Sequence, residues 1–169
     1  METKVEVDIN YNEKETRKVV IYFLNHVNKL WIAFPCFAAV LISIILDAIH
    51  KRLAEYSYGL LAVYLIAFLA FYGWFYLRIP NGFVEFYKKR KGGTYTFSDS
   101  DVKIVGSEIQ SICAWSVFKE AFETPSALLL SDTNKFLYIF PKRCFKSSED
   151  VEELRRILNS KFKKFKRYL

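Results

Sequence analysis

Two apolar segments decide the fold of this chain: LWIAFPCFAAVLISIILDAI at residues 30–49 and YGLLAVYLIAFLAFYGWFYL at residues 58–77. Each is about as long as the ~20 helical residues that cross a ~30 Å hydrocarbon layer. Asp47, near one end of the first segment, is the only acid or base within them. The pattern predicts a transmembrane helical hairpin over residues 30–79, with a short charged connector between the two helices.

A buried helical hairpin inside a large water-soluble domain is the alternative interpretation, because a helix that is apolar on all sides also occurs at the centre of a globule. A chain of 169 residues offers little other apolar surface to cover two such helices. Hydrophobic residues make up 52% of the chain and charged residues 25%, and the charges are segregated from the apolar segments. The composition therefore favours a membrane protein.

The distribution of basic residues predicts the orientation, since Lys and Arg that flank a span tend to remain cytoplasmic. The connector holds Lys51 and Arg52, whereas more bases flank the outer ends of the two spans: Arg17, Lys18, Lys29, Arg78, Lys88, Lys89, Arg90 and Lys91. Both termini are therefore expected to be cytoplasmic. Trp31, Asp47 and Trp74 lie near span ends, and we expect them at the membrane interface.

The segment 80–169 predicts a β domain that ends in a helix. Short apolar runs alternate with turn clusters from Gly92 onward, and the segments 128–130 and 136–140 flank a polar loop in the manner of a hairpin. Ser147 and Asp150 then form a capping box for an amphipathic helix. Its expected apolar stripe runs to the end of the chain: Val151, Leu154, Leu158, Phe162, Phe165 and Leu169.

The segment 1–29 predicts a strand followed by a helix. Val5, Val7 and Ile9 alternate with polar residues, and Asn12 is a suitable helix cap. Because a lone strand is unstable in water, we expect this strand to join the sheet of segment 80–169. The prediction is thus one β domain that is interrupted by the membrane hairpin.

The order of motifs from residue 109 to 158 resembles the YcxB-like proteins of bacteria. A strand reaches Ala114-Trp115, another covers residues 118–123, and the hairpin is followed by Pro141-Lys142-Arg143-Cys144-Phe145 and the amphipathic helix. The resemblance implies a membrane α+β protein whose antiparallel β-sheet domain is pleckstrin-homology-like and closed by the C-terminal helix. It also implies a multi-pass protein of the bacterial inner membrane, and it supplies no active-site residue.

Two groups of cations are candidate binding residues for anionic lipid headgroups or a phosphorylated ligand. They are Lys88, Lys89, Arg90 and Lys91 after the second span, and Lys142 and Arg143 after the last long strand. The alternative is structural: the first group fixes the topology, and the second is an exposed basic pair at the end of a strand. Both interpretations are open at this stage.

Signals of catalysis are sparse. His26 and His50 are predicted near opposite membrane faces, and no metal-ligand spacing is present, so neither a catalytic residue nor a metal or cofactor is expected. Cys36, Cys113 and Cys144 are isolated, which suits a reducing compartment. The aromatic residues of the basic C-terminal tail fall on the predicted packing stripe, so nucleic acid is not an expected partner.

The sequence therefore favours a non-enzymatic membrane protein that acts by binding. The leading hypothesis is a self-immunity or regulatory protein with a protein partner or a homo-oligomeric state, in addition to the lipid bilayer. The rival is a membrane effector or sensor whose β domain binds an anionic ligand, such as a signalling nucleotide or lipid headgroup. A lipid-modifying enzyme lacks a nucleophile–base pair in the sequence.

Overall fold

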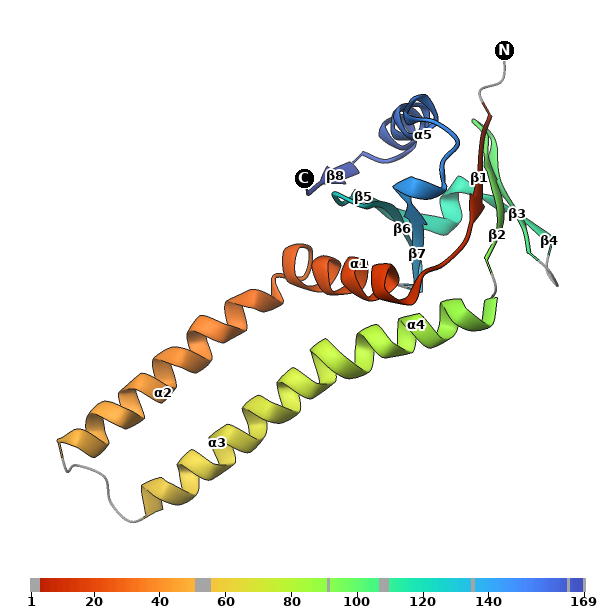
Figure 1. Ribbon diagram of the computed structural model, residues 1–169. Coiled ribbons are helices and arrows are strands. Elements are labelled where there is room, and N and C mark those ends of the chain that lie inside the picture. The colour runs from red at the N-terminus through yellow and green to blue at the C-terminus, as the bar shows by residue number, and fades with distance from the viewer. Residues whose placement is uncertain are drawn as a thin grey trace. The chain divides into compact units, whose positions relative to one another are not determined.

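The computed structural model describes residues 4–50, 56–90, 92–106, 110–134, 136–163 and 165–168. These residues form two compact units, shown in Figure 1. The hairpin unit comprises Val20–Gly82, and the β unit comprises Met1–Val19 together with Phe83–Leu169. The β unit is therefore assembled from sequence on both sides of the apolar hairpin.

The hairpin unit is built from helices. Helix α1 (Glu13–His26) enters it from the β unit, and a 3₁₀ turn, η1 (Leu30–Ile32), precedes α2 (Ala33–Ile49). Helix α3 (Tyr56–Tyr72) continues through a π-helical segment, η2 (Gly73–Arg78), into α4 (Ile79–Arg90), which re-enters the β unit. Asn12 caps α1 as expected, because its Oδ1 accepts a hydrogen bond from the Lys14 amide at 3.0 Å.

An aromatic seam, made by Phe34, Phe37, Tyr64, Phe68 and Phe71, joins α2 to α3. The half-buried positions recur at spacings of three and four residues on both helices, as in a left-handed helix pair. The Phe37 ring lies centrally, with its centroid 5.0 Å from that of Phe68 and 5.5 Å from that of Tyr64. The Tyr64 hydroxyl also donates a hydrogen bond to the Phe37 carbonyl.

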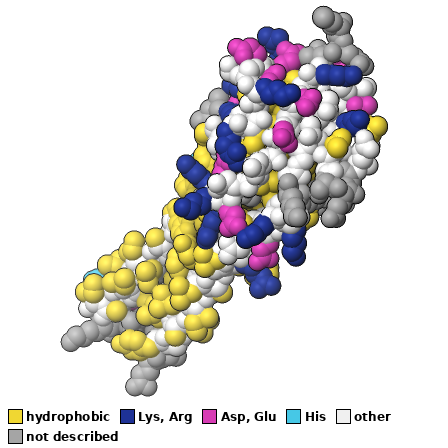
Figure 2. Space-filling view, turned by 45° about the vertical axis from the view of Figure 1, so that its right-hand side comes forward, with side chains coloured by type: hydrophobic (Ala, Val, Ile, Leu, Met, Phe, Trp, Pro, Cys, Tyr) yellow, Lys and Arg dark blue, Asp and Glu magenta, His cyan; other side chains and the backbone are white. Residues whose placement is uncertain are grey.

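Many other apolar side chains of α2 and α3 are exposed. Ile42 is 55% exposed and Ile66 is 67% exposed. Leu30–Ile49 and Tyr58–Lys89 are helices long and apolar enough to cross a membrane, and neither of their most apolar windows is buried. Figure 2 shows this apolar surface in yellow. These helices therefore do not form the core of a water-soluble globule within this chain.

The second helix is longer than the sequence indicated. The prediction of a span at 58–77 with a β domain from residue 80 missed α4, since the apolar helix continues to Lys89. Pro80 and Gly82 suggested a break, but Pro80 lies in the first turn after the π-helical segment, where the ladder of i to i−4 hydrogen bonds is already interrupted. The missing amide hydrogen of Pro80 therefore costs little at this position.

The β unit contains two sheets, whereas the family resemblance implied one antiparallel sheet. The first consists of β1 (Val5–Ile9), β2 (Gly93–Phe97), β3 (Asp101–Val105) and β4 (Gln110–Ala114), antiparallel in the order β1-β2-β3-β4. The second consists of β5 (Phe118–Glu123), β6 (Ala127–Asp132), β7 (Leu137–Pro141) and β8 (Phe165–Arg167), in the order β7-β6-β5-β8. Within the second sheet, β8 runs parallel to β5.

The strand before the hairpin pairs with the strand after it. The antiparallel register of β1 and β2 runs from Val5 opposite Phe97 to Ile9 opposite Gly93. Gly92, with φ +76°, is required where the chain enters β2, because a Cβ there would lie 1.9 Å from the Ile9 carbonyl oxygen. Thus β2, the first strand after the hairpin, pairs directly with β1, the strand before it.

One hydrophobic core spans both sheets and the last helix. Helix α5 (Ser148–Lys161) contributes Leu154, Ile157 and Leu158 to this core, and the Ser147 side chain accepts from the Asp150 amide, as the capping box predicted. The predicted helical stripe was wrong at Phe165, which lies in β8 (Phe165–Arg167), and Leu169 lies outside the described residues. Helix α5 ends at Lys161 and the chain continues as β8, because pairing with β5 satisfies the backbone there.

Candidate functional site

Lys142 and Arg143 follow β7 in the short turn η4 (Lys142–Cys144), and each contacts an acid of the β unit. The Lys142 ammonium donates to Glu123 Oε1 at 2.7 Å. The Arg143 guanidinium donates to Glu15 Oε2 at 2.7 Å and to the Asn10 carbonyl at 2.5 Å. The pKa of Arg143 is raised, mainly by the hydrogen bond to Glu15. Arg143 is exposed, as the structural interpretation of the basic pair expected, and Lys142 is half-buried. Both residues also tie segments of the β unit together.

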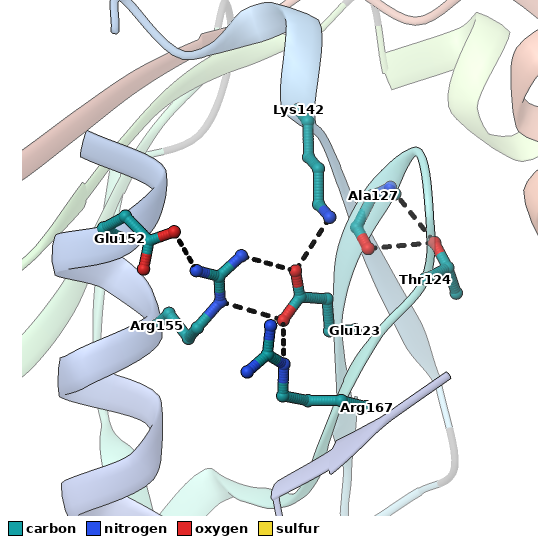
Figure 3. A network of polar contacts seen from close by, with 7 residues as sticks. All are labelled: Glu123, Thr124, Ala127, Lys142, Glu152, Arg155 and Arg167. Atoms are coloured by element: carbon teal, nitrogen blue, oxygen red, sulfur yellow. Dashed lines mark hydrogen bonds and ion pairs between the residues drawn. The ribbon is translucent and has the colours of Figure 1, made fainter. Parts of the chain in front are cut away.

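Glu123, which the sequence analysis did not single out, is the centre of a cationic cluster formed by Lys142, Arg155 and Arg167 (Figure 3). Its side chain is fully buried and accepts from all three. Arg155 binds it in a bidentate manner, at 2.7 Å and 2.9 Å, and Arg167 Nε lies 3.0 Å away. The cluster therefore joins β5, the η4 turn, α5 and β8.

The carboxyl group of Glu123 is ionised at neutral pH. Burial raises the pKa of its carboxyl, but hydrogen bonds from Arg155 and Lys142 outweigh that effect and hold the pKa at about 2. A carboxylate that is ionised at neutral pH and surrounded by donors has no proton to give and no free lone pair to accept one. The arrangement thus stabilises the fold and does not provide acid–base chemistry.

One feature of the sequence points to this cluster. Arg155 lies four residues after Val151 and three before Leu158, which places a charged side chain on the apolar stripe of α5. It is 14% exposed in the structure, so its charge demands a buried partner. Pairing across more than thirty residues with Glu123 was not readable from spacing alone.

The N-terminus of α5 is also occupied by an acid of the chain. The pKa of Glu149 is lowered by hydrogen bonds from its own backbone amide and from the side chains of Ser147 and Ser148. An open cavity of about 440 Å³ lies beside these residues and extends to Lys142. Carboxylates of the chain therefore pair with the positive groups of this region: Glu149 with the N-terminus of α5, and Glu123 with Lys142.

Lys88 lies at a second, more enclosed cleft of about 310 Å³ within the β unit. Asn10, Thr16 and Tyr87 are among its lining residues. Lys88 pairs with Glu13 at 2.9 Å, and a hydrogen bond to Lys88 is the main cause of the lowered pKa of Glu13. Of the basic residues predicted to bind headgroups, the structure thus brings Lys88, and not Lys142 or Arg143, to this cleft.

The other members of that basic group are less informative. Lys89 is exposed on α4, whereas Lys91 and the side chain of Arg90 lie outside the part of the chain that the structure describes. The predicted interface residues are all exposed in the hairpin unit: Trp31, Asp47 and Trp74. The guanidinium carbon of Arg78 lies 5.0 Å from the Trp74 ring centre, a cation–π contact between two residue types that favour membrane interfaces.

Catalytic and metal-binding groups were not expected. His26 and His50 each hydrogen-bond a backbone carbonyl four residues earlier in their own helix, through ring Nδ1. Within the described ranges, no three His, Cys, Asp or Glu side chains are grouped as metal ligands.

The described residues define an α+β protein with two long apolar helices and two sheets that are largely antiparallel. A family model described as YcxB-like protein matches residues 97–158, from the end of β2 into α5. The YcxB-like resemblance drawn from the sequence is therefore confirmed over this segment. No curated protein and no solved structure matches the chain.

Proposed function

We propose that this chain is a bacterial inner-membrane protein without catalytic activity, which acts by binding a protein partner as a self-immunity or regulatory factor. The observation that carries the proposal is the pairing of β1 with β2 across an uncovered apolar hairpin. Two spans return the chain to the side from which it started, so the β unit can form only when both flanks are on one side. The positive flanks favour the cytoplasm as that side.

The arrangement of the β unit supports a pleckstrin-homology-like architecture. A four-stranded antiparallel meander, β1 to β4, is followed by the antiparallel strands β5 to β7 and by helix α5, whose apolar face enters the shared core. Such modules present rigid surfaces for binding, which suits a protein that holds a partner at the membrane. We therefore propose this architecture for the cytoplasmic domain, with the hairpin as its membrane part.

The distribution of charge favours a protein partner over an anionic ligand at the predicted basic pair. An anion at Lys142 or Arg143 would compete with Glu123 or Glu15, and Glu123 is fully buried and bound by three cations. The hairpin, by contrast, keeps a broad apolar surface away from its aromatic seam. Such a surface suits contact with lipid and with the spans of another membrane protein.

The test is a protection assay with the full chain. Bacteria that express it are challenged with any toxin encoded beside its gene, and proteins that co-purify with it are identified after cross-linking. We expect restored growth and one specific partner. A matched control carries Ile42→Lys and Ile45→Lys, which oppose insertion by about 3 kcal/mol each without touching the β unit. Absence of protection together with absence of a partner would contradict the proposal.

The second candidate function is an effector or sensor that binds an anionic headgroup or signalling nucleotide. The Lys88 cleft is the observation in its favour, because polar Asn10 and Thr16 line it together with Lys88, whose side chain is 71% exposed while it pairs with Glu13. Thermal unfolding of the full chain in detergent is measured with cyclic nucleotides and with phosphatidylglycerol, since a bound ligand raises the midpoint with its occupancy. A rise that disappears in Lys88→Ala, but not in Lys89→Ala, would favour this function over the first.

A further inference from the structure

Strand β4 forms an open edge of the first sheet. It pairs with β3 from Asp101 opposite Ala114 to Val105 opposite Gln110. No other strand in the described part of the chain pairs with it, and Figure 1 shows it at the end of the sheet, beyond β3. Its outward backbone amides and carbonyls are therefore available to another strand.

The edge lacks the features that usually block strand addition. The residues of β4, Gln-Ser-Ile-Cys-Ala, include no charge and no proline. Ile112, at its centre, is 68% exposed, more than any other large apolar side chain described in the β unit. The edge strand β8 differs, because it is three residues long and carries Lys166 and Arg167.

We propose that β4 pairs antiparallel with β4 of a second copy of this chain, around a two-fold axis at Ile112. In this register Ile112 faces its own counterpart, Gln110 faces Ala114, and Ser111 faces Cys113. No pair places like charges opposite each other, although the chain carries a net charge of +7. The two copies of Lys103, which lies opposite Ile112 on β3, would be three strand spacings apart, about 14 Å. That separation exceeds the screening length of about 8 Å at physiological salt.

The small size of the edge argues for a second copy as the occupant. Two five-residue strands bury less than the roughly 1,200 Å² of a stable complex. A partner arriving from solution gains too little from such an edge. A second copy anchored in the same membrane is present at a high effective concentration. This concentration compensates for the small contact area of the edge. This step rests on the membrane anchoring proposed above.

Oxidative cross-linking in membrane vesicles tests the interface. The full chain, with Cys36, Cys113 and Cys144 replaced by Ala, carries Ile112→Cys or, as a matched control, Val105→Cys. Val105 is also exposed, at 38%, but lies on the interior strand β3. We expect a disulfide-linked dimer from Ile112→Cys and little from Val105→Cys. A mixture of Gln110→Cys and Ala114→Cys chains should cross-link as a heterodimer, which checks the register.

A charge at the axis provides the second readout. In the otherwise unaltered chain, Ile112→Lys places two ammonium groups against each other and should weaken self-association at least about tenfold. Val105→Lys should leave it unchanged, and in each variant a thermal midpoint close to that of the unaltered chain shows that the fold survives. Equal cross-linking at positions 112 and 105, no cross-linking at 112, or adducts of Ile112→Cys only with a different protein would overturn the proposal.

The same vesicles separate this inference from the proposed function. Alkaline carbonate releases peripheral proteins and leaves spanning proteins in the pellet. If the chain stays in the pellet but Ile112→Cys forms no dimer, the β4 interface is contradicted and the proposed membrane function is not. A chain that is released contradicts the membrane function, and its cross-linking still decides whether β4 pairs with itself.

Discussion

Different forces stabilise the two units of this chain, each within itself. The hairpin unit relies on a seam of aromatic rings between two helices that are apolar on every side. The β unit has a buried apolar core and, beside it, a carboxylate bound by three cations. A helix in lipid gains little from burying apolar area against another helix. If the hairpin unit lies in a membrane, as proposed above, ring contacts and a hydrogen bond stabilise its packing, whereas burial of apolar area stabilises the β unit.

Removing the central charge of the β unit should have the largest effect. Glu123→Gln leaves Arg155, Lys142 and Arg167 beside a neutral amide, and we expect it to lower the free energy of unfolding by about 3–5 kcal/mol. The control is Glu120→Gln, since Glu120 is half-exposed and 3.5 Å from Lys166, a pair worth about 1 kcal/mol at most. Denaturation in detergent is followed by Trp115 fluorescence after Trp31 and Trp74 are replaced by Phe. Equal losses in the two variants would contradict the role given to Glu123.

Acid should remove a comparable part of that stabilisation. The folded-state pKa of Glu123 is about 2, below the value of about 4.3 for an unfolded glutamate. A lowered pKa stabilises the fold above pH 4.3, and the contribution is lost as the pH falls toward 2. We expect a loss on the order of 3 kcal/mol over that range, measured by the same fluorescence assay. Glu123→Gln should lack this part of the pH dependence, and an unchanged pH profile in that variant would count against the assignment.

In the hairpin unit, Phe37→Ala should act on packing alone. Its ring contacts those of Tyr64, Phe68 and Phe71, and at about 0.5–1.5 kcal/mol for each aromatic pair the expected loss is about 2 kcal/mol. Ile42→Ala, at an exposed position, should change little in a lipid-like environment. Trp31 and Trp74 report the unfolding when Trp115 is replaced by Phe. Equal effects of the two substitutions would mean that the seam does not hold the helices.

The smallest expected effect concerns the single hydrogen bond in the seam. Tyr64→Phe removes the hydroxyl that donates to the Phe37 carbonyl and keeps the ring in place. Hydrogen bonds between membrane helices average about 0.6 kcal/mol, so a loss near that size is expected in the same hairpin assay. Tyr58→Phe, at an exposed position, is the control. A loss as large as that of Phe37→Ala would assign the seam to polar and not aromatic contacts.

Local patterns in the sequence predicted the elements that depend on local physics. The two apolar helices follow from their length and composition, the strands from alternation and turn residues, and the start of α5 from Ser147. The sequence missed α4, because Pro80 and Gly82 are usually breakers and the π-helical segment that accommodates Pro80 leaves no clear signal.

Long-range contacts account for the other differences. The spacing of Phe162 and Phe165 continues a helical period, yet the parallel pairing with β5 converts residues 165–167 into a strand. The Glu123 cluster likewise collects side chains from four separate elements, so neither the fate of Lys142 nor that of Arg167 was readable from neighbouring residues. Among the described basic residues proposed as a binding site, Lys88 lines a cleft of about 310 Å³, and Lys142 lines the more open cavity of about 440 Å³.

The central claim is that one β unit is assembled from both flanks of a hairpin that crosses the membrane. Single cysteines at Asp8, on β1, and Lys103, on β3, are compared with one at His50, at the end of α2, in a chain whose native cysteines are replaced by Ala. Spheroplasts are treated with a membrane-impermeant maleimide before and after lysis. We expect His50→Cys to react in intact spheroplasts, and Asp8→Cys and Lys103→Cys to react only after lysis. Reaction of Asp8→Cys and Lys103→Cys on opposite sides of the membrane would contradict the account.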